Sequence, residues 1–324
     1  MSTSGGTRAI IAALLANLGI AVTKFIAWLL TQSSSMLAES IHSVADSGNQ
    51  ALLLLGGRRA TRAATPQHPF GYGRERYIYA FIVSIVLFSV GGLFALYEAY
   101  HKYQHPDPID RWQWVPVTVL IVAIVLESFS LRTAVKESNH VRGRATWKQF
   151  VRNARAPELP VVLLEDIGAL LGLVFALVGV SMTLVTDNGY WDAAGTAAIG
   201  LLLVAIAIVL AIETKSLLLG ESATPEDVAK IEQAITDGPE VSRIIHMKTL
   251  HLGPEEVLVA AKVAVEPTTS AAEVSRHINA VEDRIRAAVP MARVIYLEPD
   301  IYSAEAAEQP PKTGTGEPAG EPAH

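Results

Sequence analysis

Long stretches without any charged residue mark the first two thirds of the chain. Residues 77–97, 167–186 and 193–212 contain no Asp, Glu, Lys or Arg. Each stretch is close to the roughly 20 residues that a helix needs to cross the hydrocarbon core of a lipid bilayer. With the shorter apolar runs, the pattern predicts six membrane helices, near 9–31, 36–57, 77–101, 112–135, 159–186 and 190–213. We therefore expect an α-helical protein that spans the bilayer six times.

After Glu221 the pattern becomes that of a small water-soluble domain. Thr224 before Pro225 predicts a helix start, because Thr caps helices and Pro suits the first helical position. The elements expected here are a helix from Thr224, strands over 243–252 and 257–265, and a strand over 293–298. Between the last two strands, Ser270-Ala-Ala-Glu273 predicts the capped start of a second helix over 270–289. The order αββαβ predicts an α+β domain with its helices on one face of a small sheet.

Charge divides the chain near the same point. Residues 1–221 hold 17 basic and 15 acidic residues, whereas residues 222–324 hold 9 and 17. We expect a membrane domain over 1–221, a soluble domain over 222–302 and a disordered tail over 303–324, which lacks large apolar residues. The acidic second part argues against binding of nucleic acid. The absence of Cys excludes disulfides, thiolate catalysis and Cys metal sites.

Basic residues concentrate in two of the predicted loops. They are Arg58, Arg59, Arg62, Arg74 and Arg76 after the second helix, and Lys136, Arg142, Arg144, Lys148, Arg152 and Arg155 after the fourth. The loops at the other end of the bundle offer only Lys102 and Arg111. By the positive-inside rule both termini should be cytoplasmic, which agrees with an even number of spans. The expected location is the cell inner membrane.

The second predicted helix carries an unusual row of polar residues. Glu39, His42, Asp46 and Asn49 follow one another at i, i+3, i+7 and i+10, so they share one helix face. Ionisable residues inside a membrane helix are unfavourable and usually mark function. His42 and Asp46, at i and i+4, can converge on one ion. Imidazole and carboxylate without thiolate suit Zn(II) and neighbouring divalent metals.

Two other helices add carboxylates, namely Glu165 and Asp166 in the fifth helix and Glu127 in the fourth. In a purely structural interpretation, these groups pair with one another and with Lys24 of the first helix to hold the bundle together. One buried ion pair would account for one carboxylate, but it does not account for a His, an Asn and several acids. Metal or proton handling is the favoured prediction.

Three motifs in these regions resemble one family of membrane proteins. The segment from Ser35 to Gln50, with Glu39, His42, Asp46 and Asn49, resembles the second membrane helix of the cation diffusion facilitator family of zinc transporters. The run His68-Pro-Phe-Gly-Tyr-Gly-Arg-Glu-Arg-Tyr is similar to that family's loop into the third helix. Leu163-Leu-Glu-Asp with Gly168 is similar to the fifth helix of a branch that includes an animal mitochondrial zinc transporter.

The resemblance implies six helices, a cytoplasmic ferredoxin-like domain and a homodimer. It also implies that two i, i+4 pairs, on the second and fifth helices, hold the transported ion. His42 and Asp46 match the first pair and Asp166 matches one member of the second. The other member falls at Val162, which cannot bind metal. The remaining candidates for the fourth ligand are Glu39, Asn49, Glu127, Glu165 and water. Glu165 lies about 100° around the helix from Asp166, so a regular helix would direct it elsewhere.

Two further metal sites of the family are reduced here. The loop site falls near Thr65, His68 and Tyr72, which leaves one ligand, so His68 is interpreted as a hydrogen-bonding loop residue. The soluble-domain site falls at Ile245, Ala261 and Leu297. His246, His251 and His277 lie nearby, but His246 and His251 should point to opposite faces of a strand. A regulatory metal site there is not favoured.

The resulting prediction is a proton-coupled transporter that exports a divalent metal, most simply Zn2+, from the cytoplasm across the bilayer. Proton antiport comes from the resemblance, and His42 suits it because an ordinary imidazole titrates near pH 6.5. The donors would also accept Fe2+, Co2+, Mn2+ or Cd2+. The alternatives are an intramembrane metal-dependent hydrolase and a membrane scaffold that transports nothing. An enzyme is disfavoured, because the sequence shows no separate general base or oxyanion motif.

Overall fold

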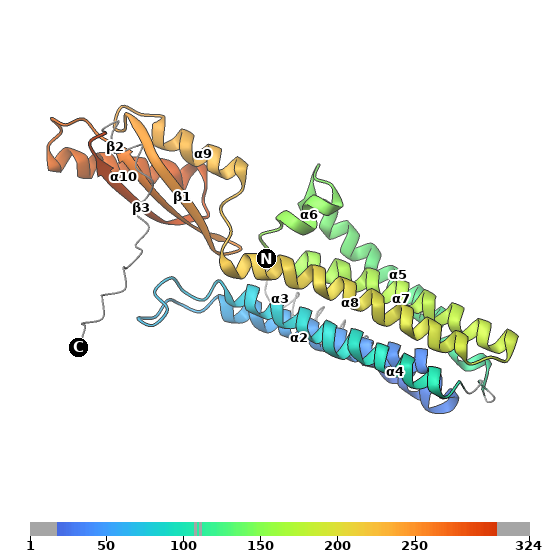
Figure 1. The fold of residues 1–324 in the computed structure, drawn as a ribbon. Coiled ribbons are helices and arrows are strands. Elements are labelled where there is room, and N and C mark those ends of the chain that lie inside the picture. The colour runs from blue at the N-terminus through green and yellow to red at the C-terminus, as the bar shows by residue number, and fades with distance from the viewer. Residues whose placement is uncertain (1–17, 107–108, 110–111, 303–324) are drawn as a thin grey trace, which may run out of the picture. The chain divides into compact units, whose positions relative to one another are not determined.

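The computed structural model describes residues 18–106, 109 and 112–302 (Figure 1). The chain divides into two compact units, Met1–Gly220 and Glu221–His324, and each contains its own cluster of buried apolar side chains. The expectations for residues 9–17 and for a disordered tail after 302 lie outside the described residues. The predicted fold class, a helical membrane domain followed by a small α+β domain, is confirmed.

The first unit is helical throughout its described part. A first helix covers Leu18–Thr31. The others are α2 (Ser34–Ala60), α3 (Glu75–Val86), the π-helix η1 (Leu87–Leu93), α4 (Phe94–Gln104), α5 (Trp114–Arg142), the short α6 (Trp147–Asn153), α7 (Glu158–Thr186) and α8 (Tyr190–Leu219). Because α3, η1 and α4 form one continuous helical segment, these elements correspond to the six predicted spans plus α6.

Among the described residues, four helical segments are long and apolar enough to cross a membrane. They are Glu75–Gln104, Trp114–Arg142, Glu158–Thr186 and Tyr190–Leu219. The 27-residue α2 has the length but is too polar to qualify, because its buried face carries the predicted polar row. The first helix is described over too few residues to qualify. The helix that is too polar to meet this criterion is therefore the one that carries Glu39, His42 and Asp46.

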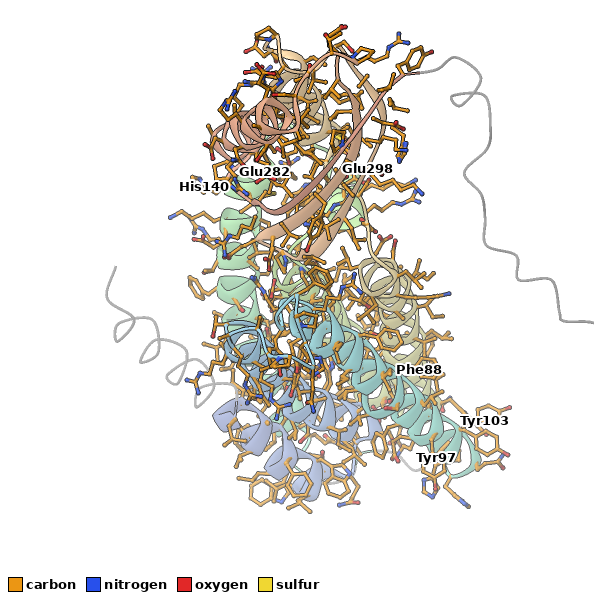
Figure 2. All side chains as sticks on the ribbon, turned by 90° about the vertical axis from the view of Figure 1, so that its left-hand side faces the viewer. Phe88, Tyr97, Tyr103, His140, Glu282 and Glu298 are labelled. Atoms are coloured by element: carbon orange, nitrogen blue, oxygen red, sulfur yellow. The ribbon has the colours of Figure 1, made fainter. Side chains whose placement is uncertain are left out.

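The membrane unit is apolar on the outside. Large side chains such as Phe88, Tyr97 and Tyr103 point away from the bundle (Figure 2), and Tyr97 and Tyr103 are more than half exposed. Lys24, Glu39 and other charged groups are completely buried instead. This arrangement suits a bundle whose surroundings are lipid, since polar groups inside a bilayer face the bundle interior.

Two features of the helical unit depart from the predicted helices. The third span contains a π-helical stretch at Leu87–Leu93, which includes Gly91 and Gly92. Such stretches often occur at functional positions. The short α6 lies in what was expected to be a loop, and its N-cap Thr146 forms a capping box with Gln149.

The start of α2 is held by a carboxylate from α8. Asp192, fully buried, accepts hydrogen bonds from the backbone N–H groups of Ser34 and Ser35 at 2.8 and 3.2 Å and from the Ser33 hydroxyl at 3.0 Å. The first N–H groups of a helix have no intrahelical acceptor, and a negative charge there also complements the helix dipole. Asp192 thereby fixes the end of the polar helix.

Helices α7 and α8 meet at glycines. A Cβ atom on Gly195 would lie 2.9 Å from the Phe175 carbonyl oxygen and 3.3 Å from the Cα atom of Gly179. Only a residue without a side chain permits this approach of two backbones, as is common where membrane helices pack. The glycines thus fix the distance between the helix that carries Glu165 and its neighbour.

Replacing Gly195 by Ala should therefore destabilise the bundle. The added methyl group must push the α7 backbone away, and overpacking of this kind typically costs about 1–3 kcal/mol. The expected result is a lower midpoint of thermal unfolding for the purified full-length protein in detergent. Gly57→Ala, also in a helix but with nothing within 4 Å of the new Cβ atom, serves as the control. Equal midpoints for the two variants would contradict the close contact.

The second unit has the predicted order of elements: α9 (Pro225–Thr236), β1 (Arg243–Gly253), β2 (Glu256–Ala264), α10 (Ala271–Ala288) and β3 (Ala292–Asp300). The sheet order is β1-β2-β3, with β1 antiparallel and β3 parallel to the central β2. Alternate residues of β2 are buried in the same cluster as apolar side chains of α9 and α10, so both helices cover one face of the sheet. The helix caps predicted at Thr224 and Ser270 are present.

An ion pair links the end of α9 to α10. Arg284 donates to both carboxylate oxygens of Glu240, at 3.1 and 2.9 Å, and also to the Ala234 carbonyl oxygen at 3.0 Å. These hydrogen bonds from Arg284, together with a backbone hydrogen bond, hold the pKa of Glu240 below its ordinary value. A carboxylate with a lowered folded-state pKa stabilises the fold above its unfolded pKa, and the stabilisation is lost as the pH falls through the folded pKa.

Glu240→Gln should therefore lower the stability of the domain at neutral pH and flatten its acid dependence. We expect a loss of about 1 kcal/mol at pH 7, because the pair is partly exposed, and a smaller difference from wild type below pH ~4. Denaturation of fragment 222–302 at several pH values, followed by circular dichroism, measures this. Glu226→Gln, which removes an exposed pair with Lys230, is the control. A constant difference from pH 7 to pH 3 would contradict the assignment.

Candidate metal centre

His42 and Asp46 lie together inside the helical bundle. They occupy successive turns of α2, and His42 Nε2 is 3.5 Å from Asp46 Oδ2. The His42 side chain is 1% exposed and that of Asp46 is 15% exposed. The polar face of α2 is thus turned inward as predicted, and the two residues are close enough to act on one ion.

The polar residue one turn before His42 has a partner on the first helix. Lys24 Nζ lies 3.0 Å from Glu39 Oε2 and donates to the Ser43 hydroxyl oxygen at 2.8 Å. Lys24 and Glu39 are both fully buried. The sequence indicated Lys24 as a partner for the carboxylates of the bundle, and the structure identifies Glu39 as that partner.

The two adjacent carboxylates of α7 face different helices. Asn49 of α2 donates its side-chain N–H to Glu165 Oε1 at 2.7 Å. Ser130 of α5 donates its hydroxyl to Asp166 Oδ2 at 3.1 Å. Both carboxylates are buried. The α7 helix is regular here, so Glu165 reaches α2 without the helix distortion that the sequence argument required.

Val162, at the family's remaining ligand position, packs among apolar side chains. The acid that α7 presents to α2 is Glu165, one turn further along the chain. Asn49 holds this carboxylate in place. The sequence did not identify the side chains that hydrogen-bond these acids, such as Ser130, which donates to Asp166. The only indication of Ser130 in the sequence was its position one turn after Glu127.

His42 and the acidic side chains of α2, α5 and α7 interact electrostatically. The carboxylates of Glu127 and Asp166 interact electrostatically with Asp46, and Glu39 and Glu127 interact with His42. Glu165 interacts with Asp46 and Asp166. Several acids that share a buried region repel one another, and a divalent cation would relieve that repulsion. The predicted site residues thus belong to one electrostatic region, although they come from three helices.

Several buried polar atoms of this region lack a hydrogen-bond partner among the described residues. They are Glu39 Oε1, His42 Nδ1 and Nε2, Asp46 Oδ1 and Asn49 Oδ1. Buried polar atoms are normally paired, so a group of such atoms requires an explanation. All five belong to one face of α2, and all are atom types that can bind a cation or a proton.

No three His, Asp or Glu side chains within the described ranges converge closely enough to hold one metal ion. The structure brings His42 and Asp46 together, but it holds Asp166 toward α5. A ligand set that includes both helices would need movement of α7 relative to α2, or a change in the side-chain conformation of Asp166.

The two reduced sites are not assembled either. His68 is exposed, donates its backbone N–H to the Thr65 hydroxyl oxygen and contacts the Tyr72 ring edge-on. In the soluble domain, Ala261 is buried and Leu297 packs against the apolar core. His246 is exposed whereas His251 is buried.

Comparison with known proteins gives consistent matches. Residues 10–219 match the family described as the cation efflux transmembrane domain, and residues 223–300 match the cation efflux protein cytoplasmic domain. The chain is 33% identical over 243 residues to the human proton-coupled zinc antiporter SLC30A9, mitochondrial. That alignment covers 74% of this chain and 42% of the relative, so the chain spans less than half of that protein.

Two more distant relatives are also matched. Metal tolerance protein C4 of Arabidopsis thaliana is 26% identical over 258 residues, which cover 79% of this chain and 56% of the relative. Zinc transporter ZitB of Pectobacterium atrosepticum is 25% identical over 268 residues, which cover 82% and 78%. The family matches extend over both units, and they agree with the polar helix and the small α+β domain. The chain therefore belongs to the cation diffusion facilitator family, the cation efflux transporters, which are multi-pass membrane proteins and not enzymes.

Proposed function

We propose that this protein exchanges Zn2+ for protons across a membrane and thereby exports the metal from the cytoplasm. The observation that carries the proposal is the buried pair of His42 and Asp46 on α2, which shares one electrostatic region with the acids of α7. Both the human relative and ZitB carry zinc in their names. The donor types also permit Fe2+, Co2+, Mn2+ and Cd2+, so zinc is the proposal and the divalent class is the chemistry.

The proposed ligands are His42, Asp46 and Asp166, with Glu165 as the fourth. Glu165 is favoured over Glu39, Asn49 and Glu127 because it comes from α7 and its carboxylate already contacts α2 through Asn49. Asp166 would join when its hydrogen bond to Ser130 breaks. Asp166 would thus exchange Ser130 of α5 for the ion beside α2. Ion binding would thereby change the relative position of α2, α5 and α7, as alternating access requires.

Proton coupling is proposed on the chemistry of His42. The imidazole must be neutral to bind metal, so metal and proton compete for the same nitrogen. Neither ring nitrogen has a hydrogen-bond partner in the described part of the chain. The human relative is named as a proton-coupled antiporter, which supports the same mechanism.

The membrane orientation, the domain limits and the dimer are proposed from the distribution of basic residues and from the family matches. The positive-inside rule supports cytoplasmic termini, and the proposed location is the cell inner membrane. The soluble domain, residues 222–302, would then serve a homodimer, as its family match suggests. These assignments of orientation, domain limits and dimer complete the proposal.

Sealed liposomes that contain the purified full-length protein test the function. With an inward zinc gradient and an opposed pH gradient, zinc should accumulate inside and protons should leave, as followed with two trapped dyes. Collapse of the pH gradient by an ionophore should slow the uptake. Zinc uptake no faster than in protein-free vesicles would contradict transport and would favour the scaffold alternative.

A further inference from the structure

Lys24 places a buried amino group inside the candidate transport region. It is 0% exposed, and its ammonium group lies 3.0 Å from Glu39 Oε2 and 2.8 Å from the Ser43 hydroxyl oxygen. A buried ion pair is a weak source of net stability, because the cost of desolvating two charges offsets most of their attraction. The pair therefore requires an explanation other than stability.

Glu39 has a second oxygen that the pair does not use. Glu39 Oε1 is buried and has no hydrogen-bond partner within the described segments. It lies 2.7 Å from the position that a Cβ atom on Gly172 would occupy, so the glycine of α7 makes room for the carboxylate. Glu39 thus spans from Lys24 on the first helix to the surface of α7, with one free oxygen on the α7 side.

The position of Glu39 continues the polar row of α2. It precedes Asp46 by seven residues, which corresponds to about 10 Å along a helix. It lies toward the end where α2 begins, away from the basic loop that follows Ala60. A cation that moves along this face from His42 and Asp46 toward the start of α2 meets the Glu39 carboxylate next, and Lys24 is already bound there.

We propose that Glu39 is a second binding station for the transported divalent cation, and that Lys24 is the resident counter-charge that the cation must displace from it. This inference rests on the proposed transport function and adds an affinity-determining residue to it. Lys24 repels a divalent ion at His42 and Asp46, which weakens binding there and favours release.

Zinc binding and zinc uptake by the full-length protein test the proposal. Removal of the charge in Lys24→Met should lower the zinc Kd, measured by competition with a chelating dye, by about tenfold or more. It should also lower the maximal uptake rate by about tenfold, because the ion is released more slowly. Lys24→Arg, which keeps the charge, should stay within about threefold of wild type in both. Lys148→Met, the same change at an exposed lysine of α6, should alter neither.

An unchanged Kd for folded Lys24→Met protein would overturn the proposal and make the pair structural. Because that variant leaves a buried acid unpaired, a second variant, Lys24→Met with Glu39→Gln, removes both charges. This double variant should bind zinc within about threefold of wild type, yet transport it at least about tenfold more slowly, since the station is missing. Transport at the wild-type rate by the double variant would overturn the proposal. Failure of the wild-type protein itself to take up zinc would instead refute the transport function.

Discussion

Replacement of Asp46 or Asp166 by Ala should reduce zinc uptake into liposomes to the level of vesicles without protein. Each change removes a negative charge that offsets the charge of the ion in a buried region, where solvent compensates little. Loss of an outer-shell partner already lowers metal affinity by about 10–100-fold, and loss of a ligand should exceed that. Initial uptake rates at several zinc concentrations, compared at equal amounts of reconstituted protein, give the measurement.

The two variants should differ in one respect. Asp46 lies 3.5 Å from His42, whereas Asp166 accepts a hydrogen bond from Ser130 of α5. Asp46→Ala should therefore weaken the first binding of zinc, while Asp166→Ala should leave detectable binding and block the later step. Glu137→Ala, which removes an exposed acid from α5, is the matched control. Near-normal uptake by both Asp variants would refute the ligand assignment.

His42→Asn should flatten the pH dependence of zinc binding and transport. In the wild-type protein, protons compete with zinc for the His42 imidazole, so a fall in pH protonates the ligand and weakens zinc binding. Asn retains polarity but neither titrates nor binds as imidazole does. We expect an affinity about tenfold weaker than that of the wild type, and a much smaller loss of affinity as the pH falls.

This test must distinguish the contribution of His42 to the pH dependence from the contributions of neighbouring carboxylates. Glu39 interacts electrostatically with His42, and Glu165 is buried beside Asn49, so either acid can contribute protons. Glu39→Gln and Glu165→Gln, each combined with His42→Asn, remove these contributions in turn. His68→Asn, at an exposed loop position, is the control for the substitution itself. An unchanged pH profile and affinity in His42→Asn would assign proton coupling to a carboxylate.

The membrane unit and the soluble domain were both predictable, because each depends on patterns within single elements. The absence of charge over 167–186 predicts a span, and α7 ends at Thr186. The caps at Thr224 and Ser270 predict helix starts because a cap and its partner are three residues apart in the chain. The π-helical stretch at Leu87–Leu93 and the short α6 were not predicted, since neither interrupts or creates a hydrophobic pattern.

For the site, the sequence alone determined that Glu39, His42, Asp46 and Asn49 share one face, because spacing around a helix is a local property. It could not determine what lies opposite each residue. Packing decided that Lys24 pairs with Glu39, that Glu165 faces Asn49 and that Asp166 faces Ser130. Each of these contacts joins residues from two helices. The rotation of one helix relative to the other, and its shift along the axis, depend on side chains and glycines along the whole length of the bundle. Periodicity specifies the face of a helix, but only the tertiary structure specifies its neighbour.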